Sequence, residues 1–260
     1  MARPHTVLAG GTDFYPARVG RTIVEDVLDI GAIPVLRGIS VIPTGWRLGA
    51  TTTWSEFLGA DLPPLFDGLK QAAREVGGRQ IQNAGTLAGN LCNASPAADG
   101  VPCLLALDAE IEIASSAATR RVPLDKFITG VRRTALAPSE LVVAIHVPKP
   151  AREARSAFVK LGARRYLVIS IAMAAATLEI AEGRIAAARI AVGACSAVAQ
   201  RLPALETALA GAPFDGQLAD RIDSAHLAPL APIDDVRGSA GYRSEAALVL
   251  LRRLLAGFAR

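Results

Sequence analysis

The chain has 260 residues, of which 51% are hydrophobic, 20% charged and 5% aromatic, and its formal net charge is +4. This length and apolar content supply a substantial core, in one large domain or two smaller ones. The few aromatic residues supply no stacking platform for nucleic acid, so we expect the scattered Arg-Arg pairs to lie on a solvated basic face, or to contact an acidic partner subunit or an anionic cofactor.

The sequence carries no signal for export or for a membrane span. The N-terminus leads at once into a short apolar run and a Gly-Gly turn, which fits no signal peptide. The longest apolar stretch, residues 166–180, is interrupted by Ser170, Thr177 and Glu179, so it falls short of the ~20 apolar residues that a membrane span needs. The expected location is therefore the cytoplasm.

The cysteines and histidines predict no metal site or catalytic base. Cys92, Cys103 and Cys195 are widely spaced and form no C-x-x-C, so we expect buried thiols rather than disulfides, zinc or iron–sulfur ligands. The three histidines lie far apart in the sequence and are expected to be structural or exposed. We assign no catalytic acid or base.

Short apolar or alternating runs predict strands in the first half of the chain. We expect these strands at residues 6–9, 24–30, 39–43, 46–48, 110–114 and 141–147. Thr44-Gly45 is a turn-like pair that joins two of them as a hairpin, and Pro148 ends the last strand.

Caps and helical spacing predict helices between these strands. We expect them over residues 54–58, 65–76 and 101–107. The Thr run at residues 51–53 suits the N-cap of the first helix. Pro63 and Pro64 suit the first turn of the second, and Gly77-Gly78 ends it as a left-handed C-cap would.

Residues 148–154 are the best linker candidate because they combine two prolines with mixed charge. They divide the chain into residues 1–150 and 151–260, with an α+β unit on each side. In the second unit we expect buried strands or helices at residues 158–161 and 167–180, a strand at 189–193, and helices at 203–210 and 244–258.

A Gly-Gly turn follows the first predicted strand. This first glycine turn consists of Leu8, Ala9, Gly10, Gly11, Thr12 and Asp13. Two successive glycines let the backbone approach an anion closely and point several N–H groups at it, and the threonine hydroxyl adds a donor, which suits a pyrophosphate. Taken alone, the same residues are equally compatible with ordinary turn chemistry.

A second segment rich in Gly and Asn, residues 83–93, is predicted to be a loop between apolar segments. The residues of this second glycine turn that are candidates to wrap phosphate and ribose are Gly85, Thr86, Gly89 and Asn90. Further along, Asp99 is a candidate to accept a hydrogen bond from a ribose hydroxyl or a flavin ring N–H. A structured surface loop without a ligand stays open as the alternative.

Two glycine-rich phosphate loops far apart in the sequence suit a long dinucleotide such as FAD. Neither loop is a G-x-G-x-x-G that opens a helix, which disfavours a Rossmann fold. Neither is a G-x-x-x-x-G-K-[ST], which disfavours a P-loop NTPase.

Several motifs follow one another along the chain in a characteristic order and at characteristic spacings. They are residues 9–13, 49–52 and 85–99, followed by residues 141–148 and 158–165. They resemble the FAD-binding subunits of molybdenum hydroxylases, the xanthine dehydrogenase and aerobic carbon monoxide dehydrogenase medium-subunit family. The resemblance covers nearly the whole chain. It implies an α+β fold, with an FAD-binding domain of the vanillyl-alcohol-oxidase type followed by a smaller α+β C-terminal domain.

The resemblance also implies residue roles, carried over by position. The two glycine turns bind the FAD phosphates through backbone amides, and Asp99 lies on the cofactor. Val143 packs near the adenine or the flavin ring, and Lys160 lies close to the flavin. Tyr166 lies against the ring from the C-terminal domain. For Lys160, a solvated surface lysine is the alternative.

In this family, electrons leave molybdenum on a large molybdopterin subunit, pass two [2Fe-2S] clusters on a small subunit and reach the FAD, which passes them to NAD+, a quinone or another acceptor. The resemblance therefore implies a cytoplasmic, FAD-dependent oxidoreductase subunit of a heterotrimer. Substrate specificity lies on another chain, so purines, aldehydes, carbon monoxide and N-heterocycles are all compatible with this sequence.

Two features depart from the family pattern. Relatives usually have a longer segment before the first glycine turn, and many have Gly-Gly where this chain has Ala88-Gly89. Alanine is harmless there if its φ is negative and harmful if it is positive. Two alternatives stay open: a scaffold subunit that has lost its cofactor, and a free-standing flavin reductase or oxidase of the same fold, for which the sequence offers no separate substrate domain.

Overall fold

An antiparallel five-stranded sheet with the order β3-β4-β9-β5-β6 organises the first half of the chain. The computed structural model describes residues 5–258. The strands of this sheet are β3 (Ile39–Ile42), β4 (Gly45–Gly49), β5 (Glu110–Ala114), β6 (Thr119–Pro123) and β9 (Leu141–Pro148). The predicted hairpin is confirmed, because β3 pairs with β4 around Thr44-Gly45.

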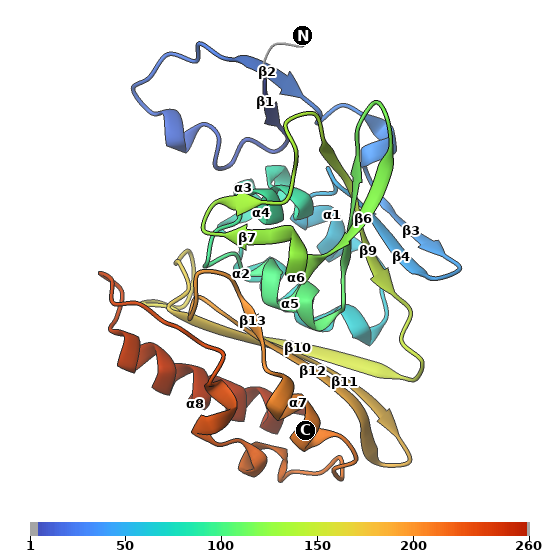
Figure 1. Cartoon of the computed structure of the whole chain (residues 1–260), viewed down its shortest axis with the longest axis vertical. Coiled ribbons are helices and arrows are strands. Elements are labelled where there is room, and N and C mark those ends of the chain that lie inside the picture. The colour runs from blue at the N-terminus through green and yellow to red at the C-terminus, as the bar shows by residue number, and fades with distance from the viewer. Residues whose placement is uncertain (1–4, 259–260) are drawn as a thin grey trace.

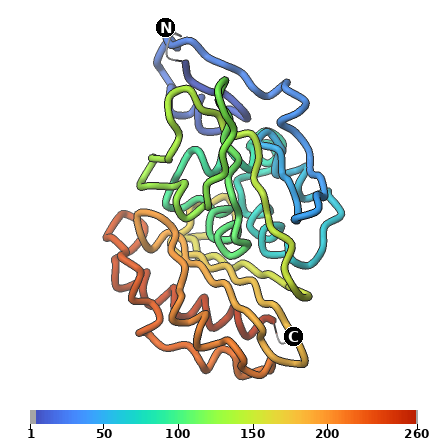
Figure 2. The backbone as a smooth tube through the Cα atoms, turned by 45° about the vertical axis from the view of Figure 1, so that its right-hand side comes forward, coloured from blue at the N-terminus to red at the C-terminus, as the bar shows by residue number. Residues whose placement is uncertain are grey.

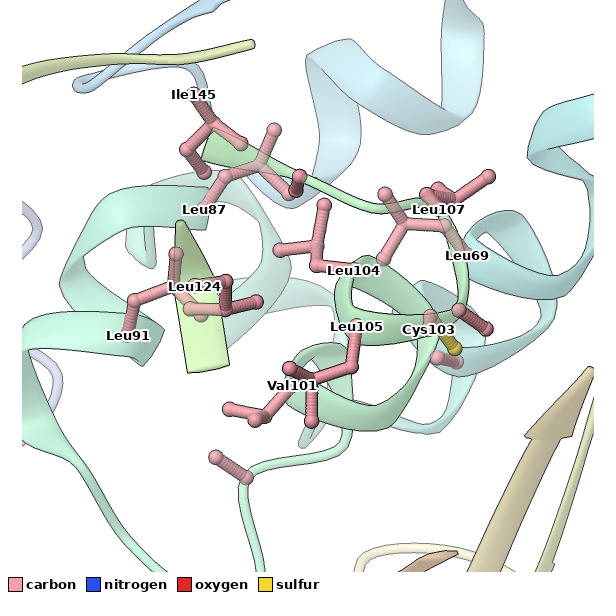
Figure 3. Packing of buried hydrophobic residues seen from close by; sticks show 14 of the residues in the cluster. Leu69, Leu87, Leu91, Val101, Cys103, Leu104, Leu105, Leu107, Leu124 and Ile145 are labelled. Carbon is pink, nitrogen blue, oxygen red and sulfur yellow. The ribbon is translucent and has the colours of Figure 1, made fainter. Parts of the chain in front are cut away.

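Helices pack against this sheet and enclose the first hydrophobic core. They are α1 (Trp54–Gly59), α2 (Asp67–Glu75), α3 (Arg79–Ala84), α4 (Leu87–Asn93), α5 (Gly100–Ala106) and α6 (Leu124–Phe127). Helix α1 begins where the Thr run predicts, because Thr53 and Glu56 form a reciprocal capping box. Side chains from α2, α4, α5 and β9, such as Leu69, Leu91 and Ile145, converge in the core (Figure 3).

A small outlying unit carries the first glycine turn. Strands β1 (His5–Leu8) and β2 (Asp26–Asp29) pair in parallel at one end of the molecule (Figures 1 and 2). No residue from 12 to 29 is buried. A short hairpin, β7 (Ile128–Gly130) and β8 (Arg133–Thr134), was not expected from the sequence.

The C-terminal half is an antiparallel sheet with helices on one face, at the opposite end of the molecule from β1 and β2 (Figure 1). Its order is β10-β11-β12-β13. The elements are β10 (Ala154–Leu161), β11 (Ala172–Ala181), β12 (Arg184–Gly193), β13 (Gln200–Arg201), α7 (Pro203–Leu209) and α8 (Ala240–Phe258). The two segments left open as strand or helix are thus mainly strands, and both predicted helices are confirmed.

The seam between the halves is formed by one face of the C-terminal sheet, which is rich in alanine. Along β11, Met173 and Ala175 belong to the first core, whereas Ala174 and Ala176 face the second core under α8. This alternation follows from the two-residue period of a strand. Helix α2 lies so close that a Cβ on Gly68 would be 2.9 Å from the carbonyl carbon of Ala157. The α+β fold expected from the resemblance is confirmed.

Within residues 5–258, no helix is both long and apolar enough to cross a membrane. In the same part of the chain, no group of three or more His, Cys, Asp or Glu side chains is arranged to hold a metal ion.

Candidate functional site

The two glycine turns, distant in the sequence, are in direct contact. A Cβ on Gly10 would be 1.9 Å from the carbonyl oxygen of Ala84 and 2.9 Å from the Cα of Gly85. Gly11 has φ +71°, and a Cβ there would be 2.7 Å from Cε2 of Tyr15. Glycine is therefore required at both positions, at Gly10 by the close approach of another backbone and at Gly11 by the left-handed conformation.

The second turn is the break between two short helices. Residues 83–93 do not form the predicted loop, because α3 ends at Ala84 and α4 runs from Leu87 to Asn93. Its apolar residues explain the helix, since Leu87, Ala88 and Leu91 are buried against the core. The glycines were misleading because glycine is disfavoured inside a helix, yet Gly89 lies within α4.

The break itself is fastened to the Thr run that precedes α1. Trp54 N–H donates to the Gly85 carbonyl at 3.1 Å, and Leu87 N–H donates to the Thr52 carbonyl at 3.0 Å. Thr86 caps α4 by accepting from Gly89 N–H at 3.0 Å. Ala88, which departs from the family pattern, lies inside α4 and does not have positive φ, so the alanine is tolerated.

A pocket of about 380 Å³ opens between the turns. This glycine-turn pocket is lined by all ten residues of the two turns: Leu8, Ala9, Gly10, Gly11, Thr12, Asp13, Gly85, Thr86, Gly89 and Asn90. The other lining residues, which the sequence did not indicate, include Ile30, Trp54, Ile81, Cys92, Leu136 and Val142. Cys92 is exposed rather than buried as expected, whereas Cys103 and Cys195 are buried.

The polar groups of the pocket fit an anionic, hydrogen-bonding ligand. Within residues 5–258, the amides of Gly10, Gly11 and Thr12 donate no hydrogen bond to another residue. The side-chain oxygen Oδ1 of Asn90 is also buried without a partner in that part of the chain. The buried oxygen is costly to leave without a partner, and successive unpaired amides attract anions, so the pocket is suited to a ligand that interacts with both.

One wall of the pocket is the segment that leads into β9. Leu136, Glu140, Leu141 and Val142 line it, and Arg120 fixes its position. Both Nε and Nη2 of Arg120 donate to the Glu140 carboxylate at 2.7 Å. These bonds, with a further one from the Ala137 amide, lower the pKa of Glu140 to about 2.

The Glu140→Gln variant is expected to be less stable than the unaltered protein at neutral pH. A carboxyl whose pKa is depressed by folding contributes stability above its unfolded pKa and loses that stability as the pH falls toward its folded pKa. Thermal unfolding should therefore show a difference in melting temperature between the two proteins, and this difference should narrow as the pH falls from 4.5 toward about 2. A Glu245→Gln control, at an exposed position of α8, should show no such difference. A difference that does not depend on pH would contradict this role of Glu140.

Asp99 and Lys160 form a buried ion pair across the seam. Lys160 Nζ donates to Asp99 Oδ2 at 2.6 Å, and Ser170 Oγ donates to Asp99 Oδ1 at 2.6 Å. The two charged side chains are 7% and 6% exposed, so Lys160 is not a solvated surface residue. Burial raises the pKa of Asp99, while Lys160 and Ser170 oppose that rise. Neither Asp99 nor Lys160 lines the glycine-turn pocket, although Gly100 next to Asp99 adjoins Asn90.

Two further residues are not brought to the pocket by this structure. Val142, rather than Val143, lines the pocket, because successive side chains of β9 point to opposite faces of the sheet. Tyr166 is 55% exposed on the turn after β10, where its ring lies 5.2 Å from the guanidinium of Arg165.

Comparisons with known proteins identify the family of both halves of the chain. Residues 2–150 match the family described as the FAD binding domain in molybdopterin dehydrogenase. Residues 157–257 match the CO dehydrogenase flavoprotein C-terminal domain.

Similar proteins are subunits of dehydrogenases. The chain is 31% identical to the xanthine dehydrogenase FAD-binding subunit of Escherichia coli O157:H7, over 91% of this chain and 82% of that one. It is 32% identical to the carbon monoxide dehydrogenase medium chain of Afipia carboxidovorans, over 97% and 87%. A chain of reconstituted CO dehydrogenase from Oligotropha carboxidovorans superimposes with a TM-score of 0.88 at 29% identity, covering 98% of this chain and 90% of that one. The chain therefore belongs to the family of FAD-binding medium subunits of molybdenum hydroxylases, and it is an FAD-dependent oxidoreductase subunit.

Proposed function

We propose that this chain carries electrons between subunits of a molybdenum hydroxylase. In this proposal it accepts electrons from [2Fe-2S] clusters on a small partner subunit, downstream of a large molybdopterin subunit, and delivers them to NAD+ or another acceptor. The observation that carries the proposal is the contact between the two glycine turns, which creates one pocket from two segments that are distant in the sequence.

Different residues of the pocket would hold different parts of FAD. The free amides of Gly10, Gly11 and Thr12 are the donors for the diphosphate. Asn90 Oδ1 provides an acceptor at the second turn. Trp54, Ile81 and other apolar residues exclude water from the remainder of the cavity.

Bound FAD would supply the redox chemistry through its isoalloxazine ring, and the protein would position that ring. We assign the Asp99–Lys160 pair to the side of the cofactor next to the seam. The pair supports this assignment because Lys160 fixes the C-terminal half against Asp99, and the next residue, Gly100, adjoins Asn90 of the pocket.

The proposal is tested on the complex purified with its partner subunits. We expect one FAD per copy of this chain, visible as flavin absorbance that is bleached when the substrate of the large subunit is added without an electron acceptor. A fully assembled, active complex without flavin would identify the chain as a scaffold. Turnover of a small substrate by the isolated chain would instead favour a free-standing flavin enzyme.

A further inference from the structure

An arginine with an unusual backbone conformation sits at the tip of the β7-β8 hairpin. Arg132 has φ +57°, a left-handed conformation that favours glycine or asparagine at such a turn.

The side chain of Arg132 links three parts of the chain that are distant in sequence. Its Nη1 donates to the backbone carbonyl of Asn93 at 3.3 Å and also to Asn93 Oδ1. Asn93 Nδ2 in turn donates to Asp13 Oδ2 at 2.8 Å. Arg132 Nη1 is 3.9 Å from Asp13 Oδ1. The β7-β8 hairpin, the end of α4 and the first glycine turn are thus joined at the pocket, which Asp13 and Asn93 line.

Asp13 places a negative charge on the wall of a pocket whose free amides suit a diphosphate. A carboxylate beside an anionic ligand is unfavourable unless a cation neutralises its charge or donors hydrogen-bond to it. Arg132 and Asn93 supply that compensation. Residues 12–25 lie outside the β1-β2 pairing, and none of them is buried.

We propose that Asp13, Asn93 and Arg132 form a latch that holds the first glycine turn closed over bound FAD and sets the rate at which FAD dissociates. This inference rests on the proposed function. Opening the latch frees residues 12–25, which precede β2, to move away from α4, and this movement opens the diphosphate end of the pocket. Arg132 is a positioning residue in this account, since it acts through Asp13 and Asn93.

The test compares Arg132→Ala with Arg133→Ala in the full chain loaded with FAD. Arg133 is the next residue and has no ion pair among residues 5–258, so it is a matched control for loss of one positive charge. Because the contacts of Arg132 are exposed, we expect Arg132→Ala to release FAD about two- to fivefold faster after dilution, followed by flavin fluorescence. The association rate should stay within about twofold, because variants of one site differ mainly in dissociation.

Two further measurements separate a latch from a general loss of structure. Arg132→Lys keeps the charge and should recover part of the slow release. Added salt should speed FAD release from the unaltered chain and leave Arg132→Ala almost unchanged, because salt screens the exposed pair. Equal release from Arg132→Ala, Arg133→Ala and the unaltered chain would overturn the latch alone. Absence of FAD from the unaltered complex would overturn the proposed function and the latch together.

Discussion

A Gly10→Val variant is expected to lose bound FAD completely while the C-terminal half stays folded. The Cβ that valine adds would be 1.9 Å from the Ala84 carbonyl oxygen, far below any contact that real atoms make. The first glycine turn must then move away from the second, and the diphosphate loses donors from one side. The measurement is the FAD content of the purified variant, with circular dichroism to establish that it is folded.

Gly216→Val is the matched control for this variant. A Cβ at Gly216 meets nothing within 4 Å, and its φ is not positive, so the same substitution is tolerated there. We expect Gly216→Val to keep one FAD per chain. Retention of FAD at full occupancy by Gly10→Val would show that contact between the turns is not needed for binding.

The Lys160→Met variant is expected to lose about 3–5 kcal/mol of stability at neutral pH, because removing one partner leaves a buried charge uncompensated. Burial already raises the pKa of Asp99, and loss of Lys160 removes a group that opposes the rise. When folding raises the pKa of an acid, the folded protein loses stability as the pH rises from the unfolded-state pKa to the folded-state pKa of that acid. The loss should therefore shrink in acid, where Asp99 takes up a proton. Chemical unfolding at several pH values measures it.

The double variant Asp99→Asn/Lys160→Met tests whether the buried charge is the cause. It removes both charges and keeps an amide beside Ser170, so we expect it to recover much of the lost stability. If the single and double variants are equally unstable at every pH, the packing of the Lys160 side chain, rather than its charge, holds the seam.

The sequence predicted the parts of the fold that depend on local patterns. The Thr run gave the capped start of α1, Thr44-Gly45 gave the β3-β4 hairpin, and alternation gave β5 at its observed bounds. These features depend on side chains within a few residues of one another, so they are visible without tertiary structure. The resemblance added the family and the cofactor, which local patterns did not determine.

Predictions from the sequence were less accurate wherever tertiary contacts decide the local structure or the position of a side chain. Gly89 and Asn90 were placed in a loop, but the buried face of α4 overrides their low helix propensity. A solvated surface position stayed open as the alternative for Lys160, because its partner, Asp99, lies 61 residues away in the sequence. The wall residues Leu136 and Val142 were missed because nothing in their own segment marks them as facing the two glycine turns.

Hydrogen exchange of the assembled complex, compared with and without FAD, tests most directly whether both turns hold one cofactor. The account predicts that amide protection rises together at residues 10–12 and 85–90 when FAD binds, with the same dependence on FAD concentration. Protection at only one turn, or at neither, would contradict the claim that the two turns hold a single diphosphate between them.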